Sequence, residues 1–276
     1  MNGKLYIVAT PIGNLGDMSP RGIDTLKSVD FIAAEDTRVT LKLLNHFDIK
    51  KPMVSYYEHN RAQSGDKIIE RILAGETCAL VSDAGMPAIS DPGCDLARLC
   101  WENRIEVISV PGASAIICAL AVSGIDTGRF CFEGFLSTAN KSRMEHLNSL
   151  KTETRTMVFY EAPHKLLATL VDMQNTFGDD RRIALCRELT KIHEQTAHFT
   201  LKSAVEFYEE HIPKGEYVIV IEGAEIEERD MTEEALSMVK RLVSEGESLK
   251  NACREASNAT KVPKNVLYKL ALEREI

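Results

Sequence analysis

The sequence predicts an α/β protein with two domains and a small helical module behind them. Short apolar runs alternate with segments of helical spacing through the first half of the 276 residues, and this alternation favours a parallel sheet. The following stretch is richer in strands, which favours a mixed sheet. We therefore expect a parallel α/β domain over residues 1–124, a mixed-sheet α/β domain over 125–224 and a basic helical module over 231–276.

The first domain is expected to carry its binding site at one edge of its sheet. Apolar runs predict strands at residues 4–10, 31–34, 53–56, 78–81 and 105–110. Each run ends in a polar or Gly/Pro-rich loop that leads to a helix. The first helix begins at Pro20 behind Ser19, a good N-cap residue. In an open parallel sheet the loops beyond the carboxyl ends of the strands lie together and bind ligands.

Sequence patterns also predict the strands of the second domain and the helices of the tail. Strands are predicted at residues 130–135, 156–160, 182–186, 195–201 and 217–221. We expect the last two to pair with each other, and residues 137–154 to be a polar segment. A solvated linker over 225–230 leads to helices at 231–244, 248–256 and 264–274. The last two helices, joined by a tight turn, resemble a helix-turn-helix.

Charge is distributed unevenly along the chain. The net charge is −8, which argues against nucleic acid when taken alone. Residues 225–235 carry one arginine and six acidic residues, whereas residues 236–276 carry eight Lys or Arg and five acidic residues. The tail is therefore a basic module behind an acidic hinge.

Composition excludes several classes of protein. No apolar run is long enough to span a membrane. The N-terminus has no signal-peptide pattern, so we expect a cytoplasmic protein. Seven Cys without a C-x-x-C pair indicate neither a disulfide framework nor a zinc site. The His residues lack metal-ligand spacing, so no metal is expected, and neither a P-loop nor a dinucleotide-binding glycine fingerprint is present.

Residues 81–93 form the most unusual stretch of the sequence. They follow a buried strand and contain two Gly, two Pro, two Asp and two Ser. Such a long shaped loop is uncommon unless it is functional, although a plain Gly/Pro-rich connection remains an alternative. Its Asp side chains can accept hydrogen bonds from ribose hydroxyls or an amine, and its small residues let a ligand approach the backbone closely.

Polar groups follow four of the predicted strands. They are Glu35-Asp36-Thr37-Arg38, Glu58-His59-Asn60-Arg61, Glu161-Ala162-Pro163-His164 and Arg187-Glu188. Any one of them alone is more often a helix N-cap with its ion pair. Together they indicate a site, because carboxylates beside Arg and His are typical of a general base and its orienting partners.

Five ordered motifs resemble the tetrapyrrole methylase family. They are LYIVATPIGNL at residues 5–15, AEDTR at 34–38, VSDAGMP at 81–87, VPGASA at 110–115 and YEAPH at 160–164. The basic tail resembles the C-terminal helix-turn-helix-like domain of members that act on ribosomal RNA. Relatives that methylate tetrapyrroles have Gly-Gly-Asp-Pro in the loop after the fourth strand. This chain has Ser82-Asp83-Ala84-Gly85 there, so the Asp is kept while its neighbours differ.

The resemblance implies a cofactor, a reaction and partners. S-adenosylmethionine is expected between the two domains. The implied reaction is 2′-O-methylation of a cytidine ribose in the 16S RNA of the small ribosomal subunit, by a homodimer. The cofactor-lining residues that it implies are Pro11, Asp83, Gly85, Ile89, Ser114, Ala115 and Tyr160.

The sequence leaves the roles of several polar residues open. The general base is expected to be Glu35, Asp36 or Glu161. We expect Arg38, His59 and Arg187 to hold phosphate or to orient the carboxylate. Further RNA contacts are expected from Lys141, Arg143, Lys250, Arg254, Lys261, Lys264 and Lys269. Two alternatives remain: a small-molecule methyltransferase that acts on a tetrapyrrole, and a non-enzymatic regulator whose helix-turn-helix reads DNA.

Overall fold

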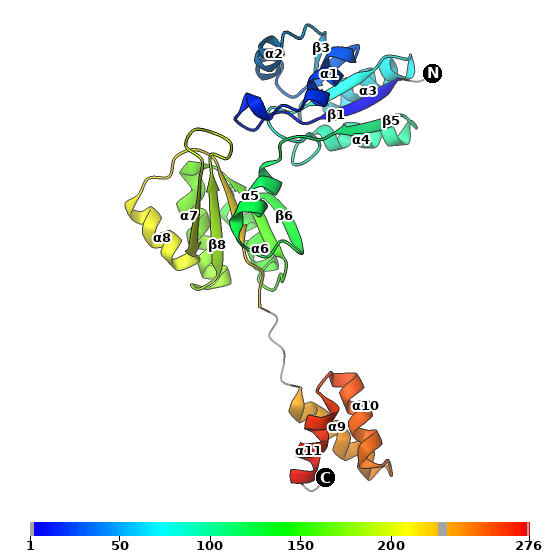
Figure 1. Ribbon diagram of the computed structural model, residues 1–276, viewed down its shortest axis with the longest axis vertical. Helices are drawn as coiled ribbons and strands as arrows, with labels where there is room; N and C mark the ends of the chain where they lie inside the picture. The colour runs from blue at the N-terminus through cyan, green and yellow to red at the C-terminus, as the bar shows by residue number, and fades with distance from the viewer. Residues whose placement is uncertain (1–2, 226–230, 275) are drawn as a thin grey trace. The chain divides into compact units, whose positions relative to one another are not determined.

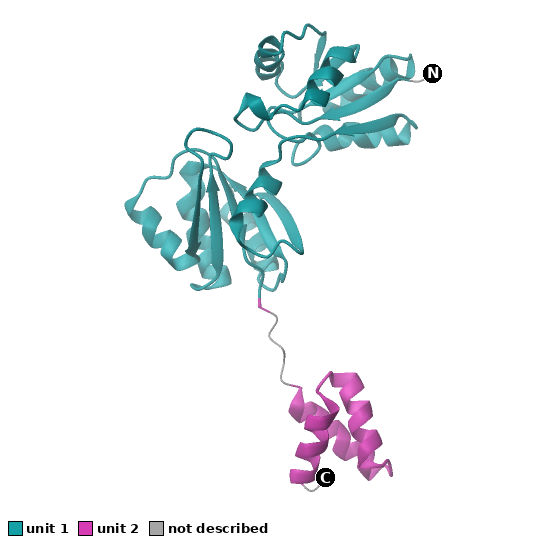
Figure 2. Cartoon of the chain, in the orientation of Figure 1, with its two compact units in different colours: residues 1–224 teal, residues 225–276 magenta. Residues whose placement is uncertain are grey.

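The computed structural model describes residues 3–225, 231–274 and 276. They belong to two compact units, one over residues 1–224 and one over 225–276 (Figure 2). The first unit holds two β-sheets, and the described residues of the second form helices and their connections (Figure 1). The expected linker at 225–230 lies, from residue 226 onward, outside the described residues. Within the described ranges, no helix is long and apolar enough to cross a membrane.

The first sheet has five parallel strands in the order β3-β2-β4-β1-β5. In chain order the strands are β1 (Lys4–Val8), β2 (Phe31–Ala34), β3 (Met53–Ser55), β4 (Cys78–Val81) and β5 (Glu106–Val110). Every residue of β2 and β4 is buried, as expected for strands covered on both faces. The prediction of a parallel sheet in this part of the chain is confirmed.

Helices cover both faces of the first sheet. In chain order they are α1 (Pro20–Ser28), α2 (Thr37–His46), α3 (Arg61–Leu73) and α4 (Gly93–Glu102), and a 3-10 turn, η1 (Leu15–Asp17), precedes α1. Leu26 of α1 and Leu44 of α2 pack with Val8 on one face. Ile72 of α3 and Leu96 of α4 join the core on the other face. Met86 and Ala88 of the loop after β4 also pack against this second face, which fixes the loop to the sheet.

The second sheet is mixed, with the order β6-β7-β10-β8-β9. In chain order the strands are β6 (Phe130–Phe135), β7 (Thr156–Glu161), β8 (Arg182–Arg187), β9 (Gln195–Thr200) and β10 (Tyr217–Ile221). Strands β6 and β7 are parallel, and the remaining pairs are antiparallel. One face is covered by α6 (Asn140–Ser149), α7 (Pro163–Phe177) and α8 (Leu201–Glu210), and the other by α5 (Ala115–Ser123).

One expectation for the second sheet, the pairing of its last two strands, was wrong. Strand β9 pairs with β8 rather than with β10. All five residues of β10 are buried, so this strand occupies the centre of the sheet, while the half-exposed β9 takes the edge. The polar segment 137–154 contains α6, and α8 follows β9 directly. Thr200 caps α8 in a reciprocal hydrogen-bond pair with Ser203, a start signal that the alternating pattern of residues 195–201 concealed.

The C-terminal unit is a bundle of three helices. These are α9 (Thr232–Ser244), α10 (Leu249–Thr260) and α11 (Lys264–Glu273). Leu236, Val239, Cys253 and Leu267 belong to its buried core. Helices α10 and α11 are joined by a three-residue turn that begins at Lys261, which has a φ of 61°. The predicted helical tail is thus present, with its second helix one turn longer than expected.

Candidate active site

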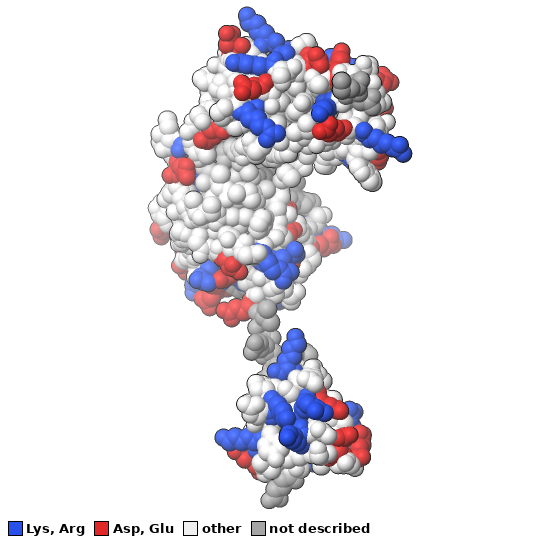
Figure 3. All heavy atoms as spheres, turned by 45° about the vertical axis from the view of Figure 1, so that its right-hand side comes forward, with Lys and Arg blue, Asp and Glu red and all other residues white. Residues whose placement is uncertain are grey.

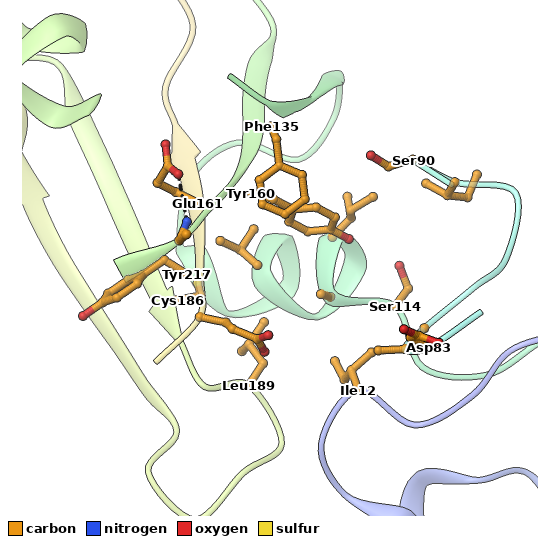
Figure 4. Close-up of a pocket in the computed structure, with 18 of the residues that line it drawn as sticks. Ile12, Asp83, Ser90, Ser114, Phe135, Tyr160, Glu161, Cys186, Leu189 and Tyr217 are labelled. Atoms are coloured by element: carbon orange, nitrogen blue, oxygen red, sulfur yellow. Dashed lines mark hydrogen bonds between the residues drawn. The ribbon is translucent and has the colours of Figure 1, made fainter. Parts of the chain in front are cut away.

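A cavity of about 640 Å³ lies between the strand-end loops of the first sheet and the second sheet (Figure 4). Asp83 and Ser114 come from the first sheet's loops and face Tyr160 and Phe135 of the second sheet (Figure 4). Eight of the predicted site residues line the cavity: Glu35, Asp83, Gly85, Ile89, Ser114, Ala115, Tyr160 and Glu161. The volume lies within the ordinary range for small-molecule sites.

The loop after β4 is held in a strained shape around this cavity. Gly85 exchanges two backbone hydrogen bonds with Thr10, of 2.9 and 3.1 Å, which tie the loop to the end of β1. Ala88 and Ser90 adopt left-handed φ values of 69° and 66°, which non-glycine residues rarely do. Asp91 stabilises this turn, since its Oδ1 accepts hydrogen bonds from the backbone of Ala88 and Gly93 at 2.9 and 2.7 Å. Such strain is commonly found at functional sites.

Two carboxylates link the loops after β2 and β4. Oε2 of Glu35 accepts a hydrogen bond from the Asp83 backbone at 3.3 Å. Oδ1 of Asp83 accepts one from the Asp36 backbone at 3.1 Å. Burial raises the pKa of both Glu35 and Asp83, and each also feels nearby negative charge. A carboxylate with a raised pKa is a better proton acceptor than an ordinary one.

Glu161 is held more rigidly than Glu35. It is buried at the end of β7, where Oε1 accepts a hydrogen bond from the Ala162 backbone at 2.8 Å (Figure 4). Its Oε2 accepts a hydrogen bond of 2.6 Å from the Thr169 hydroxyl. Both oxygens therefore already have partners inside the protein. This arrangement suits a residue that shapes the cavity wall better than one that takes up a proton.

Aromatic rings form another wall of the cavity. The Tyr160 ring centroid lies 5.3 Å from that of Phe135 and 5.0 Å from that of Phe132. Burial raises the pKa of Tyr160, so its phenol stays neutral. Phe135 is 61 % exposed although it is apolar. These rings offer a flat surface on which a heterocycle can stack.

Lys191 was not among the predicted site residues. Its Nζ lies 2.9 Å from Oε1 of Glu188 and 2.7 Å from Oε2 of Glu216, and all three residues line the cavity. The lysine stem also lies against Gly13, where an added Cβ would come within 2.5 Å of Lys191 Cγ. The signal in the sequence was the polar run that continues past Arg187-Glu188 to Lys191.

The remaining predicted residues lie outside this cavity. Asp36 caps α2 and forms an ion pair of 2.6 Å with Arg38, whose hydrogen bonds lower the pKa of Asp36 to about 2. His59 is exposed in the turn before α3. Arg187 donates a hydrogen bond of 2.6 Å to the backbone oxygen of Lys214. Pro11 lines a smaller neighbouring hollow.

The two basic residues of α6 differ from each other. Lys141 is exposed, with Glu145 as its only neighbouring acid at 3.9 Å among the ion pairs of the described residues. Arg143 is 16 % exposed and forms an ion pair of 2.6 Å with Asp172 of α7. Arg143 therefore links α6 to α7. Its positive charge, which was expected to contact RNA, is already paired with a carboxylate.

The cavity is strongly acidic. Its carboxylates are Glu35, Asp83, Asp91, Glu161, Glu188 and Glu216, and Lys191 is neutralised by two of them. A cavity of this composition attracts a cation and repels a phosphate. Across the described residues, no group of three or more His, Cys, Asp or Glu is arranged to hold a metal.

Comparison with protein families places both units of the chain. Residues 4–205 match the family model described as Tetrapyrrole (Corrin/Porphyrin) Methylases. Residues 229–275 match the model described as the RsmI C-terminal HTH domain. These matches follow the division between the sheet-containing unit and the helical one.

Similar proteins are found over the whole length of the chain. The ribosomal RNA small subunit methyltransferase I of Synechocystis sp. is 51 % identical over 275 residues, covering 99 % of each chain. The protein of that name from Bacillus subtilis is 45 % identical and covers 96 % of this chain and 93 % of its own.

Solved structures share the fold of the first unit. A uroporphyrin-III C-methyl transferase from Thermus thermophilus, complexed with S-adenyl homocysteine, has a TM-score of 0.56 at 14 % identity, over 79 % of this chain and 97 % of that one. A diphthine synthase has a TM-score of 0.60 at 13 % identity, over 80 % and 90 %. The fold, its cavity and these matches define a methyltransferase of the two-sheet α/β class. The chain belongs to the tetrapyrrole methylase family, as its motifs predicted.

Proposed function

We propose that this protein uses S-adenosylmethionine to methylate the 2′-hydroxyl of a cytidine ribose in the 16S RNA of the small ribosomal subunit. The observation that carries the proposal is the similarity to ribosomal RNA small subunit methyltransferase I from several bacteria, at 42–51 % identity over 96–99 % of the chain. That similarity extends over nearly the whole chain, including the C-terminal unit, whereas the structures of the uroporphyrin-III C-methyl transferase and of the methyltransferase CobJ cover 79 % and 80 % of it.

The cavity fits this cofactor in charge and in shape. S-adenosylmethionine carries a positively charged sulfonium whose methyl group is already activated for transfer. The acidic lining suits that cation, the Tyr160 and Phe135 rings suit its adenine, and Asp83 or Asp91 suits its ribose hydroxyls or amine. Gly85, Ser114 and Ala115 line the same space with small side chains, which allows the ligand to approach the backbone.

Glu35 is our choice for the group that accepts the ribose proton. It lines the cavity, and burial raises its pKa toward the range in which a carboxylate accepts protons well. Asp36 lies outside the cavity with a lowered pKa, and Glu161 has both oxygens occupied. Of the three sequence candidates, Glu35 therefore has the geometry and the electrostatics that a general base needs.

The RNA backbone is expected to bind outside the acidic cavity. The C-terminal unit exposes Lys250, Arg254, Lys261 and Lys269, with Lys264 half-buried. Figure 3 shows Lys and Arg side chains gathered on the visible face of this unit. Such clusters neutralise phosphates and strengthen binding at low salt.

A homodimer is supported by helix α5. All of its residues except Ser123 are apolar, yet only one side packs on the second sheet. Ile117 and Val122 are 56 % and 45 % exposed on the other side. A helix that is apolar all round is normally buried, so a second copy of the chain is our proposed cover for this surface.

Transfer of labelled methyl from S-adenosylmethionine to small ribosomal subunits, followed by nucleoside analysis, tests the proposed function. We expect labelled 2′-O-methylcytidine from the 16S RNA. Naked 16S RNA, assayed in parallel, distinguishes the free RNA from the assembled subunit as the substrate. Cofactor binding without label in either RNA would contradict the proposal, and label in a tetrapyrrole would replace it.

A further inference from the structure

A second hollow lies beside the main cavity, on the side of helix α2. Its volume is about 340 Å³. It is lined by the loop after β1, by one side of α2 and by the start of the loop after β4. Ile12, Ser82, Asp83 and Ala84 line both spaces. The two hollows therefore meet at Asp83, the residue whose carboxylate receives the Asp36 backbone hydrogen bond.

A buried hydroxyl without a partner marks this second hollow. Thr40 lines it and is only 2 % exposed. Among the described residues, nothing within hydrogen-bond distance pairs with Thr40 Oγ1. A buried polar group in this state costs stability. The cost is recovered if a ligand in the hollow supplies the missing hydrogen bond.

The other lining residues combine apolar surface with one cation. Leu15 and Val39 are 42 % and 38 % exposed, so each offers apolar surface to a ligand. Leu43 of α2 continues the same apolar surface, and Lys42 stands beside it. This composition suits a flat heterocycle that has a polar edge and a phosphate nearby.

We propose that this hollow receives the acceptor nucleoside after it leaves the RNA stack. The inference rests on the function proposed above and deepens it. The base lies against Val39 and Leu43 with a polar edge at Thr40, the flanking phosphate lies at Lys42, and the ribose lies at Asp83. The main cavity would hold the sulfonium, and the second hollow would hold the nucleoside. The wall that they share, at Asp83, is where the 2′-oxygen must meet the methyl group.

The size of the hollow also discriminates between substrates. It has room for one nucleotide, whereas a four-ring macrocycle is several times larger than a pyrimidine. Enzymes that carry out chemistry on a base extrude its nucleotide into a pocket of its own, and this hollow offers a similar place for the acceptor nucleotide. The hollow therefore favours a single nucleotide over a tetrapyrrole as the acceptor.

Filling the hollow provides the first test. Val39→Trp should block the nucleoside, because the side chain at this position lines the hollow and is partly exposed, so the fold tolerates a larger group. We expect kcat/KM for small subunits to fall by at least tenfold, with S-adenosylmethionine affinity measured by calorimetry unchanged within a factor of two. Leu41→Trp is the matched control, since Leu41 is 47 % exposed on the same helix and lines neither space.

The outcomes separate this inference from the proposed function. Full activity of Val39→Trp, beside an active wild-type protein, would overturn the nucleoside hollow and leave the methyltransferase assignment intact. Loss of cofactor affinity in Val39→Trp would also overturn it, since the hollow would then be part of the cofactor site. An inactive wild-type protein would instead contradict the proposed function itself.

Thr40→Val tests the hydroxyl without changing its volume. We expect KM for small subunits to rise about tenfold. The melting temperature of the free protein should stay the same or rise, since an unpaired buried hydroxyl is removed. A purely structural role for the hydroxyl predicts the reverse, with a lower melting temperature and an unchanged KM, and that result would overturn the assignment of Thr40.

Discussion

Glu35 and Asp83 bring two negative charges together at the meeting point of two loops. Each carboxylate accepts a backbone hydrogen bond from the opposite loop, so the pair ties the loops together while the charges repel each other. Burial raises the pKa of both groups. The negative charge of Asp83 raises the pKa of Glu35 further, and that of Asp36 raises the pKa of Asp83 further. Holding these two carboxylates buried and close to other negative charge therefore lowers local stability while it raises their pKa values.

Replacement of Glu35 should separate its role in holding the two loops together from its proposed role as proton acceptor. Glu35→Gln keeps an oxygen for the Asp83 backbone hydrogen bond but cannot take a proton. We expect turnover to fall about a hundredfold, with cofactor affinity within a few-fold of wild type. Because the folded state holds the Glu35 proton more tightly than the unfolded state, ionisation at neutral pH opposes folding. The variant should therefore melt at a higher temperature than the wild-type protein at pH 7.

The pH dependence gives an independent check of Glu35. Wild-type turnover should rise with pH until the Glu35 carboxyl, whose pKa is raised, is fully ionised, and Glu35→Gln should lack this acidic limb. Asp36→Ala is the control, because it removes the α2 cap and the Arg38 ion pair. It should lower the melting temperature while turnover stays near wild type. Wild-type turnover in Glu35→Gln would exclude Glu35 as the base.

Residue types alone predicted only part of the site. Glu35 and Asp83 could be placed together because strand-end loops of neighbouring strands converge, whereas Ser114 and Tyr160 were implied by the family resemblance. Asp36 and Arg38 belong to the same motif, but a carboxylate before a helix serves equally well as an N-cap, and here it does so. Arg143 pairs with Asp172, a partner 29 residues away, and no local pattern reveals such a pair.

At the scale of elements, strand order was harder to predict than strand identity. Alternation and apolar runs located the ten strands to within a few residues, since these patterns reflect burial directly. Pairing depends on which strand is buried on both faces, and this decided the central place of β10 over β9. Helix α5 was located by its sequence, but its packing on the second sheet comes from the tertiary fold.

The exposed side of α5 makes a testable prediction about assembly. Ile117→Glu places a charge on the apolar surface that we propose is covered by a second copy of the chain. Sedimentation velocity should show a wild-type dimer and a monomeric variant, because burying an unpaired charge is costly. Leu73→Glu is the matched control, since Leu73 is 42 % exposed on α3 and should leave the dimer intact. If the Ile117→Glu variant remains dimeric, the dimer interface does not include the exposed side of α5.

At the scale of the whole molecule, the two units differ in charge. The unit that holds the acidic cavity attracts the sulfonium and disfavours phosphate, whereas residues 236–276 carry an excess of Lys and Arg. Their sequence predicted this division, because net charge per segment needs no knowledge of packing. Affinity for RNA should therefore depend on the C-terminal unit and cofactor affinity on the first unit.

Salt dependence of RNA binding tests that division in the full-length protein. Replacing the five basic residues Lys250, Arg254, Lys261, Lys264 and Lys269 by Gln should weaken small-subunit binding. If each contacts one phosphate, the slope of log K against log salt should become shallower by about 3.5 to 4.5. The control replaces the exposed Lys27 and Lys67 of the first unit, which should leave the slope unchanged. An unaltered slope in the five-residue variant, with cofactor binding intact, would place the RNA contacts in the first unit. The counterions released on binding would then come from phosphates that the C-terminal helices do not contact.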